Sequence, residues 1–148
     1  MNTPQSHAGN VANSRETPRR AAELAGRILL GTLFLLSGLA KIGAYNATVG
    51  YMASMGVPGA LLPLVILTEV LGSLMLIIGL KTRIVAFLLG GYCGLTAIIF
   101  HHNFADQNQL THFLKDLALS GAFLTLLVNG AGPLSVDCRT VHQKRPSP

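Results

Sequence analysis

The residues in this sequence that could do chemistry are ionisable and hydroxyl side chains set within or beside long apolar segments. Glu69 is the clearest, because it interrupts an uncharged stretch rich in Leu, Ile, Val and Gly. A carboxylate can exchange a proton or hydrogen-bond a ligand, and ionisable groups inside a membrane segment are candidates for function. Seven other candidates fall toward the same ends of their segments: Ser37, Lys41, His101, His102, His112, Lys115 and Asp116.

The depth of Glu69 within its segment predicts that this carboxylate needs a partner. It lies about eight residues into an apolar run, which at ~1.5 Å per residue is roughly 12 Å below the membrane surface. We therefore expect Glu69 to be protonated, or paired with Lys41, with Lys115 or with both. Ser37 shares a helix face with Lys41, four residues away. Two alternatives stay open: Lys41 can extend to the membrane surface, and Lys115 with Asp116 can form a salt bridge at a helix start.

The histidines have both a functional and a simpler interpretation. His112 lies four residues before Asp116, so a helix would place both on one face. His101 and His102 can mark a helix end at the membrane surface, or they can contribute to a polar site. A third metal ligand at regular spacing is missing from the pattern, so we expect no metal site.

Four predicted transmembrane helices carry these candidates. The sequence has 148 residues, of which 50% are hydrophobic and only 11% charged, about half the charged fraction of a soluble domain. Uncharged stretches of about 17–25 residues can cross a bilayer. A soluble bundle would need polar outer helix faces, and these segments are apolar nearly all round. The predicted fold is an all-α integral membrane bundle with these spans: Glu23–Gly43, Gly59–Leu80, Arg83–His101 and Thr111–Val128.

The Lys and Arg residues predict the orientation of the bundle. They gather in the N-terminal segment, in the turn Leu80–Arg83 and in the C-terminal segment, whereas Ala44–Pro58 and His102–Leu110 have none. The positive-inside rule then places both termini in the cytoplasm. This distribution also accounts for the net charge of +5, so we expect no nucleic-acid partner.

The chain is predicted to have one folded unit between two tails. Residues 1–22 are polar without an apolar period, which predicts a disordered cytoplasmic tail. Residues 23–137 form the four-helix transmembrane domain, and residues 138–148 form a basic cytoplasmic tail. The cysteines, Cys93 and Cys138, fall in different environments and predict no disulfide.

A cleaved signal peptide is the alternative interpretation of the first span. Its uncharged part, Ile28–Ala40, resembles a signal-peptide core, and it ends in small residues. Arg27 and Lys41 flank this core, and both can extend toward the membrane surfaces, so the helix can be longer than its uncharged part. We therefore favour a membrane span.

Three segments together resemble the DoxX family of small four-helix membrane proteins. RILLGTLFLLSGLAKIG at Arg27–Gly43 resembles its opening helix, and TEVLGSLMLIIGLKTRIVAFLL at Thr68–Leu89 resembles its second helix and following turn. FLKDLALSGAFLTLLVNGAGPLSVD at Phe113–Asp137 resembles its fourth helix and tail, with Asp116 where the family usually has Asn. The pattern positions are Arg27, Ser37, Lys41, Glu69, Lys115 and Asp116.

The resemblance implies a multi-pass protein of the bacterial inner membrane with a redox-linked role. Some DoxX-like proteins are subunits linked to quinone-dependent oxidation, so it implies a bound quinone or a partner subunit's cofactor, with the bilayer and other membrane or redox subunits as partners. Such a chain could be a non-catalytic subunit of a quinone-linked oxidoreductase. A transporter or proton path that uses the same charges, and a structural subunit without chemistry, stay open. The oligomeric state also stays open.

Overall fold

The computed structural model describes residues 5–101 and 103–138, and this part of the chain is helical without strands. Its elements, in chain order, are α1 (Gln5–Gly43), α2 (Tyr45–Ser54), the short 3-10 helix η1 (Gly59–Leu61), α3 (Leu62–Ile78), α4 (Thr82–Phe100) and α5 (Gln107–Asn129). Four helical segments are long and apolar enough to cross a membrane, namely Glu16–Gly43, Gly59–Ile78, Thr82–Phe100 and Gln107–Asn129. These findings confirm the predicted all-α bundle of four transmembrane helices.

The first helix is longer than the sequence predicts. It begins at Gln5, so residues 5–22, for which composition predicts a disordered tail, continue the helix of the first span. Arg19 Nε donates to Glu23 Oε1 at 2.9 Å, and Arg20 pairs with Glu16 in the same i to i+4 spacing. A helix that a membrane span has already nucleated can be extended at little cost in free energy, and such ion pairs add to the stability of the extension.

A further helix lies in the segment predicted to be a loop between the first two spans. Residues Tyr45–Ser54 form α2, and Met52 is its buried residue. Its sequence, YNATVGYMAS, has no clear apolar period, which is why a pattern-based analysis misses it. The chain leaves α2 through Gly56, whose φ of 75° is accessible mainly to glycine.

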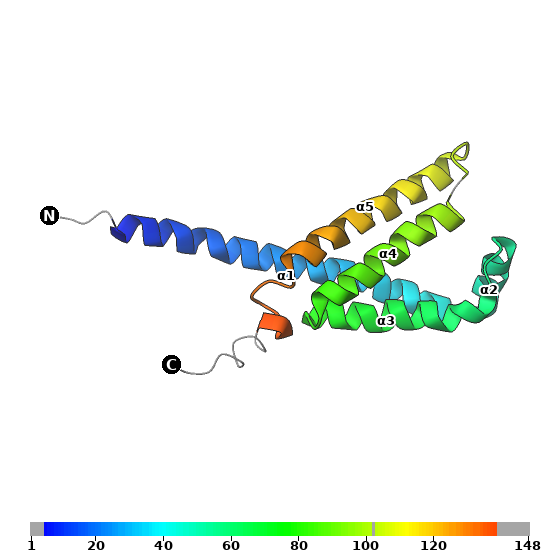
Figure 1. Cartoon of the computed structure of the whole chain (residues 1–148), viewed down its shortest axis with the longest axis horizontal. Coiled ribbons are helices and arrows are strands. Elements are labelled where there is room, and N and C mark those ends of the chain that lie inside the picture. The colour runs from blue at the N-terminus through cyan, green and yellow to red at the C-terminus, as the bar shows by residue number, and fades with distance from the viewer. Residues whose placement is uncertain (1–4, 102, 139–148) are drawn as a thin grey trace.

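The long helices pack as two pairs that meet at one end of the molecule. One pair is α1 with α3, the other is α4 with α5, and α3 also contacts α4. Figure 1 shows that the pairs lie together near the turn between α3 and α4 and diverge toward α2. We call the diverging end, with α2 and the α4–α5 turn, the α2 end.

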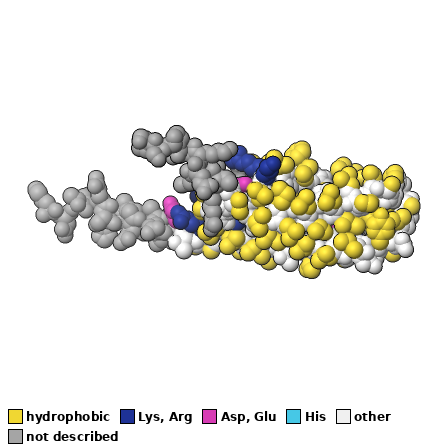
Figure 2. All heavy atoms as spheres, turned by 90° about the horizontal axis from the view of Figure 1, so that it is seen from below, with side chains coloured by type: hydrophobic (Ala, Val, Ile, Leu, Met, Phe, Trp, Pro, Cys, Tyr) yellow, Lys and Arg dark blue, Asp and Glu magenta, His cyan; other side chains and the backbone are white. Residues whose placement is uncertain are grey.

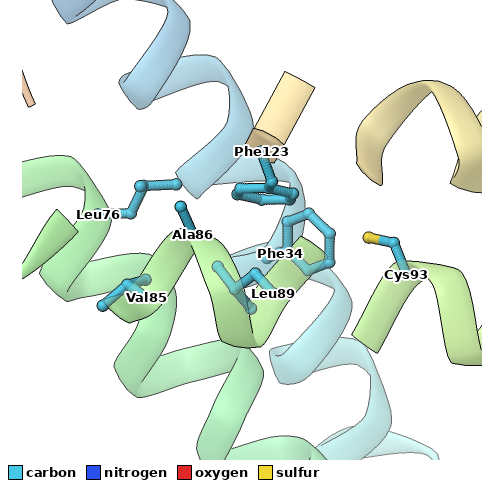
Figure 3. Packing of buried hydrophobic residues seen from close by; sticks show 7 residues of the cluster. All are labelled: Phe34, Leu76, Val85, Ala86, Leu89, Cys93 and Phe123. Carbon is cyan, nitrogen blue, oxygen red and sulfur yellow. The ribbon is translucent and has the colours of Figure 1, made fainter. Parts of the chain in front are cut away.

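The hydrophobic core fills the region where the two pairs are in contact. It consists of Phe34, Leu76, Val85, Ala86, Leu89, Cys93 and Phe123 (Figure 3). The ring centroids of Phe34 and Phe123 are 5.4 Å apart in an edge-to-face arrangement, so α1 contacts α5 across the bundle. By contrast, large apolar side chains cover the outer surface, as Figure 2 shows for one face. Such a surface suits a lipid environment rather than water.

The end opposite α2 is closed by the segment Gly130–Cys138, which we call the C-terminal clasp. Arg27, which is fully buried, donates from its guanidinium to the carbonyl of Leu134. The carboxylate of Asp137 accepts hydrogen bonds from the backbone N–H groups of Lys81 (2.7 Å) and Thr82 (2.9 Å). The clasp therefore ties α1 and the N-terminus of α4 together, and we call this end the clasp end. Apart from Cys138, the predicted basic tail lies outside the described residues.

Candidate functional site

A cavity of about 900 Å³ occupies the space between the diverging helix pairs at the α2 end. All five α-helices contribute to its wall. Much of the wall is apolar, including Leu33, Phe34, Leu62, Val65 and Leu119. The polar part of the wall contains seven of the eight residues singled out from the sequence: Ser37, Lys41, Glu69, His101, His112, Lys115 and Asp116. His102 lies outside the described residues.

The first polar group on the cavity wall, which we call the lysine–glutamate cluster, consists of Ser37, Lys41 and Glu69. Lys41 Nζ lies 2.9 Å from both carboxylate oxygens of Glu69, whose side chain is only 1% exposed. Lys41 Nζ also donates to Ser37 Oγ at 2.7 Å, and Ser37 Oγ donates to Glu69 Oε1 at 3.3 Å. The ammonium thus contacts both oxygens of the buried carboxylate, so the two side chains form an ion pair between α1 and α3.

Close packing of α1 on α3 brings this cluster together. Gly38 and Gly31 lie at the contact, and a Cβ atom added at Gly38 would lie 2.8 Å from Cγ2 of Val70 and 3.2 Å from Cβ of Glu69. Only a residue without a side chain allows the two backbones to approach this closely. The hydroxyl of Ser73 bonds the backbone carbonyl of Glu69 rather than its carboxylate.

The second polar group, which we call the histidine–aspartate cluster, lies on the α4–α5 side of the cavity. Thr96 Oγ1 lies 3.2 Å from Asp116 Oδ2, and His101 Nε2 lies 4.0 Å from the same oxygen. His101 Nδ1 lies 2.9 Å from Gln109 Oε1. The His112 ring stacks on that of His101, with centroids 5.1 Å apart and an interplanar angle of 21°.

Lys115 lies on the cavity wall without engaging either cluster. Within residues 5–101 and 103–138, its amine makes no hydrogen bond or ion pair. Of the two partners proposed for Glu69, the structure therefore selects Lys41. An unpaired amine on a cavity wall can donate to a carbonyl, hydroxyl or anionic group of a ligand.

Helix α2 covers the cavity at its wide end. Tyr51 of α2 stacks on Phe100 at the end of α4, with ring centroids 5.5 Å apart. Thr48, Tyr51 and Met52 line the cavity on this side. The aromatic contact joins α2 to the end of α4, at the end of the molecule where the two helix pairs diverge (Figure 1).

Several site residues were not found from the sequence. Thr96 and Gln109 bond members of the histidine–aspartate cluster, and Tyr92 lines the cavity with its side chain hydrogen-bonded to Glu69. Tyr92 and Thr96 are four residues apart in a span, so their shared helix face was an available signal. Gln109 precedes the predicted fourth span, and its role depends on α5 beginning at Gln107.

The cavity wall combines apolar surface with several ionisable side chains. No group of three or more His, Cys, Asp or Glu within this part of the chain could hold a metal ion. The cavity combines apolar walls, two carboxylates, two imidazoles and an unpaired amine. Such a wall can bind an amphipathic ligand and exchange protons with its polar head.

Comparison with known proteins identifies relatives of this chain. A sequence model of the DoxX family matches residues 22–102. The chain is 46% identical to inner membrane protein YqjF of Escherichia coli (strain K12) over 121 residues, 82% of this chain and 92% of that protein. It is 34% identical to inner membrane protein YphA of the same organism over 123 residues, 78% of this chain and 88% of that protein.

A third relative matches over a shorter region. The chain is 31% identical to "Putative oxidoreductase CatD" of Bacillus subtilis (strain 168) over 62 residues, 42% of this chain and 46% of that protein. No solved structure matches significantly. The inner-membrane relatives and the four membrane-spanning helices show a multi-pass protein of the inner membrane. The extent of the family match, together with these relatives, shows that the chain belongs to the DoxX family.

Proposed function

We propose that this protein is a redox-linked membrane subunit that binds a quinone in the cavity at the α2 end. The observation that carries the proposal is the composition of the cavity wall, which is largely apolar with two polar clusters and the unpaired amine of Lys115. Its volume of about 900 Å³ is in the range typical of small-molecule sites. A quinone matches this wall, because its ring and tail are apolar and its two carbonyl oxygens accept hydrogen bonds.

The polar groups have roles that suit quinone chemistry. Interconversion of a quinone and a quinol moves two electrons and two protons. Protons can exchange with the carboxylates and imidazoles on the cavity wall, and Lys115 can donate to a carbonyl oxygen. In this proposal the electrons pass to or from a redox-active partner subunit. The oxidoreductase name of the Bacillus subtilis relative supports a redox-linked role.

A tryptophan reporter tests quinone binding directly, because the sequence contains no Trp. Leu33→Trp places an indole on the cavity wall, whereas Leu29→Trp places one a turn away on the same helix, on a side chain that is 72% exposed. Both variants are reconstituted in nanodiscs and titrated with decylubiquinone, which quenches indole fluorescence. We expect saturable quenching for Leu33→Trp and only linear, partition-dependent quenching for Leu29→Trp. Linear quenching in both variants contradicts the proposal.

Substitution of Lys115 then tests the proposed contact with the quinone. In the Leu33→Trp background, Lys115→Met should weaken decylubiquinone binding about tenfold, the equivalent of one charge-assisted hydrogen bond. Lys81→Met, the same change in an exposed side chain at the clasp end, is the matched control and should leave the affinity unchanged.

Two other functions predict different outcomes. A transporter or proton path through the same charges predicts flux across liposome membranes that disappears in Glu69→Gln. A structural subunit predicts neither flux nor saturable quenching, and deletion of the chain would lower the abundance of a partner protein. The cavity wall, which is largely apolar with a few polar groups, favours a quinone-binding subunit over a transporter and over a structural subunit.

A further inference from the structure

We propose that Asp116, His101 and His112 form a proton-exchange chain that connects the cavity with the aqueous phase at the α2 end. This inference rests on the proposed function, because it assigns a route for the protons of the same ligand. The observation behind it is a difference between the two carboxylates on the cavity wall, which have different partners and therefore different roles.

Glu69 and Asp116 differ in what binds their oxygens. Both oxygens of Glu69 lie 2.9 Å from the Lys41 ammonium, and the side chain is 1% exposed. Asp116 has no such cation within the described residues, and its side chain is 23% exposed. The Thr96 hydroxyl lies 3.2 Å from Asp116 Oδ2 but 2.9 Å from the carbonyl of Cys93. A hydroxyl has one proton to donate, so Asp116 at most shares it. Asp116 is therefore the carboxylate that is available for proton exchange.

The hydrogen bond to Gln109 defines which nitrogen of His101 can accept a proton. An amide oxygen only accepts hydrogen bonds, so the Nδ1 atom of His101, 2.9 Å from Gln109 Oε1, carries the ring proton. The Nε2 atom of a neutral His101 then has a lone pair that faces Asp116 Oδ2 at 4.0 Å. Two acceptors facing each other become a donor and an acceptor when one proton is added. The pair is therefore arranged to take up and release one proton.

In this proposal His112, five residues from the start of α5 at Gln107, is the group that connects the site to water. Its ring stacks on His101 at 5.1 Å, and His112 is exposed whereas His101 is partly buried. The stacked arrangement places the two imidazoles next to each other, and Lys115 lines the same cavity. The other titratable side chains on the cavity wall are Lys41 of α1, Tyr51 of α2, Glu69 of α3, and Tyr92 and Cys93 of α4.

The proton step at this site is simple. When a quinol loses a proton in the cavity, an O–H bond breaks and its electron pair stays on the oxygen. The proton forms an N–H bond at Nε2 of His101. That bond then breaks with its electron pair on Nε2, and the proton passes through water to a ring nitrogen of His112, which releases it in the same way to the aqueous phase. Oxidation to the quinone sends two protons along this route in succession, and the two electrons leave to the redox partner of the proposed function. If the predicted orientation holds, these protons emerge on the side away from the cytoplasm.

The proposed proton-exchange chain predicts that the binding affinities of the quinone and the quinol depend on pH in opposite directions. A quinone only accepts hydrogen bonds, so it should bind better when Nε2 of His101 is protonated, at low pH. A quinol can donate a hydrogen bond, so it should bind better when Nε2 is free, at high pH. For one linked proton, the affinity ratio of quinone to quinol should change by up to about tenfold per pH unit.

The first test measures this ratio with the Leu33→Trp reporter in full-length protein, using decylubiquinone and decylubiquinol between pH 6 and pH 8. We expect the ratio to fall as the pH rises. Asp116→Asn should abolish the pH dependence, because its amide can donate permanently to Nε2. Asp106→Asn, which changes an exposed carboxylate that caps α5 at the same end, is the matched control and should retain it. A ratio that responds equally to pH in both variants overturns the inference.

The second test does not depend on ligand binding. Nitrogen-15 NMR of histidine-labelled protein in nanodiscs, assigned with a His101→Gln variant, reports the tautomer of His101. We expect the Nδ1–H tautomer for the neutral ring, and Gln109→Leu should allow a mixture, whereas Gln107→Leu should not. An Nε2–H tautomer overturns the proton chain even if quinone binds. Conversely, if decylubiquinone quenches the reporter without saturation, the proposed quinone site is refuted. The NMR result then still decides whether Nδ1 of His101 donates to Gln109.

Discussion

Glu69 and Lys41 show how a charge is kept inside a membrane protein. The carboxylate is almost completely buried, and the lysine that neutralises it is 24% exposed at the cavity. Removing one partner of such a pair leaves the other charge buried without compensation, whereas removing both leaves no buried charge. Lys115 is close enough to line the same cavity but is not bonded to Glu69.

At the residue scale, a double-mutant cycle should therefore detect coupling between Glu69 and Lys41. Lys41→Met should destabilise the bundle by about 3–5 kcal/mol, because Glu69 is left buried without its cation. Adding Glu69→Gln to that variant should recover part of the loss. Thermal unfolding in detergent measures each variant.

Lys115→Met provides the control for this cycle. Its effect should add to that of Glu69→Gln within about 0.5 kcal/mol, as for residues that do not interact. Strong coupling of Glu69 to Lys115, or additive effects at Lys41, would contradict the ion pair as described.

At the scale of the helices, glycines of α1 determine how closely α3 approaches. A Cβ atom at Gly31 would lie 2.5 Å from Cγ1 of Ile77, and one at Gly38 would lie 2.8 Å from Cγ2 of Val70. Gly26, on the same helix, has no neighbour within 4 Å of its added Cβ atom. The lysine–glutamate cluster thus depends on backbone contact between α1 and α3 as well as on its own side chains.

Gly38→Leu should separate these helices and weaken the ion pair. We expect a loss of about 1–3 kcal/mol in stability, typical of overpacking at a close contact. Gly26→Leu, the same substitution where space is open, should be neutral or slightly stabilising, because leucine favours helix more than glycine does. Thermal unfolding of the two variants side by side makes the comparison, and equal stabilities would show that the close approach is not required.

At the scale of the whole molecule, the bundle is joined firmly at one end and opened by a cavity at the other. The apolar core and the C-terminal clasp hold the helix pairs together at the clasp end. At the α2 end, the stacked rings of Tyr51 and Phe100 join α2 to α4 across the cavity. The proposed ligand site therefore lies where the helix pairs diverge (Figure 1), away from the apolar core.

Asp137→Ala should loosen the clasp. The substitution removes the acceptor for two backbone N–H groups at the N-terminus of α4, which should cost about 0.5–2 kcal/mol. Asp137→Asn keeps an acceptor oxygen and should cost less. Faster reaction of Cys138 with a thiol reagent in detergent should accompany the loss in Asp137→Ala. Equal stabilities of the two variants would show that the cap contributes little.

The predicted orientation of the whole bundle also has a direct test. Cys138 should react with a membrane-impermeant thiol reagent in inverted vesicles but not in intact cells, because the positive-inside rule places the C-terminus in the cytoplasm. Cys93 is buried in the core and should stay unreactive from both sides. A Cys138→Ser variant verifies the labelling site. Reaction of Cys138 in intact cells would reverse the predicted orientation.

The architecture and most of the site composition could be predicted from local patterns. Long uncharged segments must form hydrogen-bonded helices in a bilayer, so four spans follow from their lengths and composition. Charged and imidazole groups are costly in that environment, which singles out Glu69, Lys41 and Asp116 without a structure. Seven of the eight predicted residues do line one cavity.

The pairing of these residues depended on contacts between helices that are distant in sequence. Glu69 could have met Lys41 or Lys115, and the glycine contact of α1 on α3 decides for Lys41. The hydrogen bonds of Thr96 and Gln109 and the composition of the cavity wall likewise depend on how the helices are placed relative to one another. Periodicity reports which face of a helix is polar, but the angle and separation between helices follow from side-chain packing across the whole bundle.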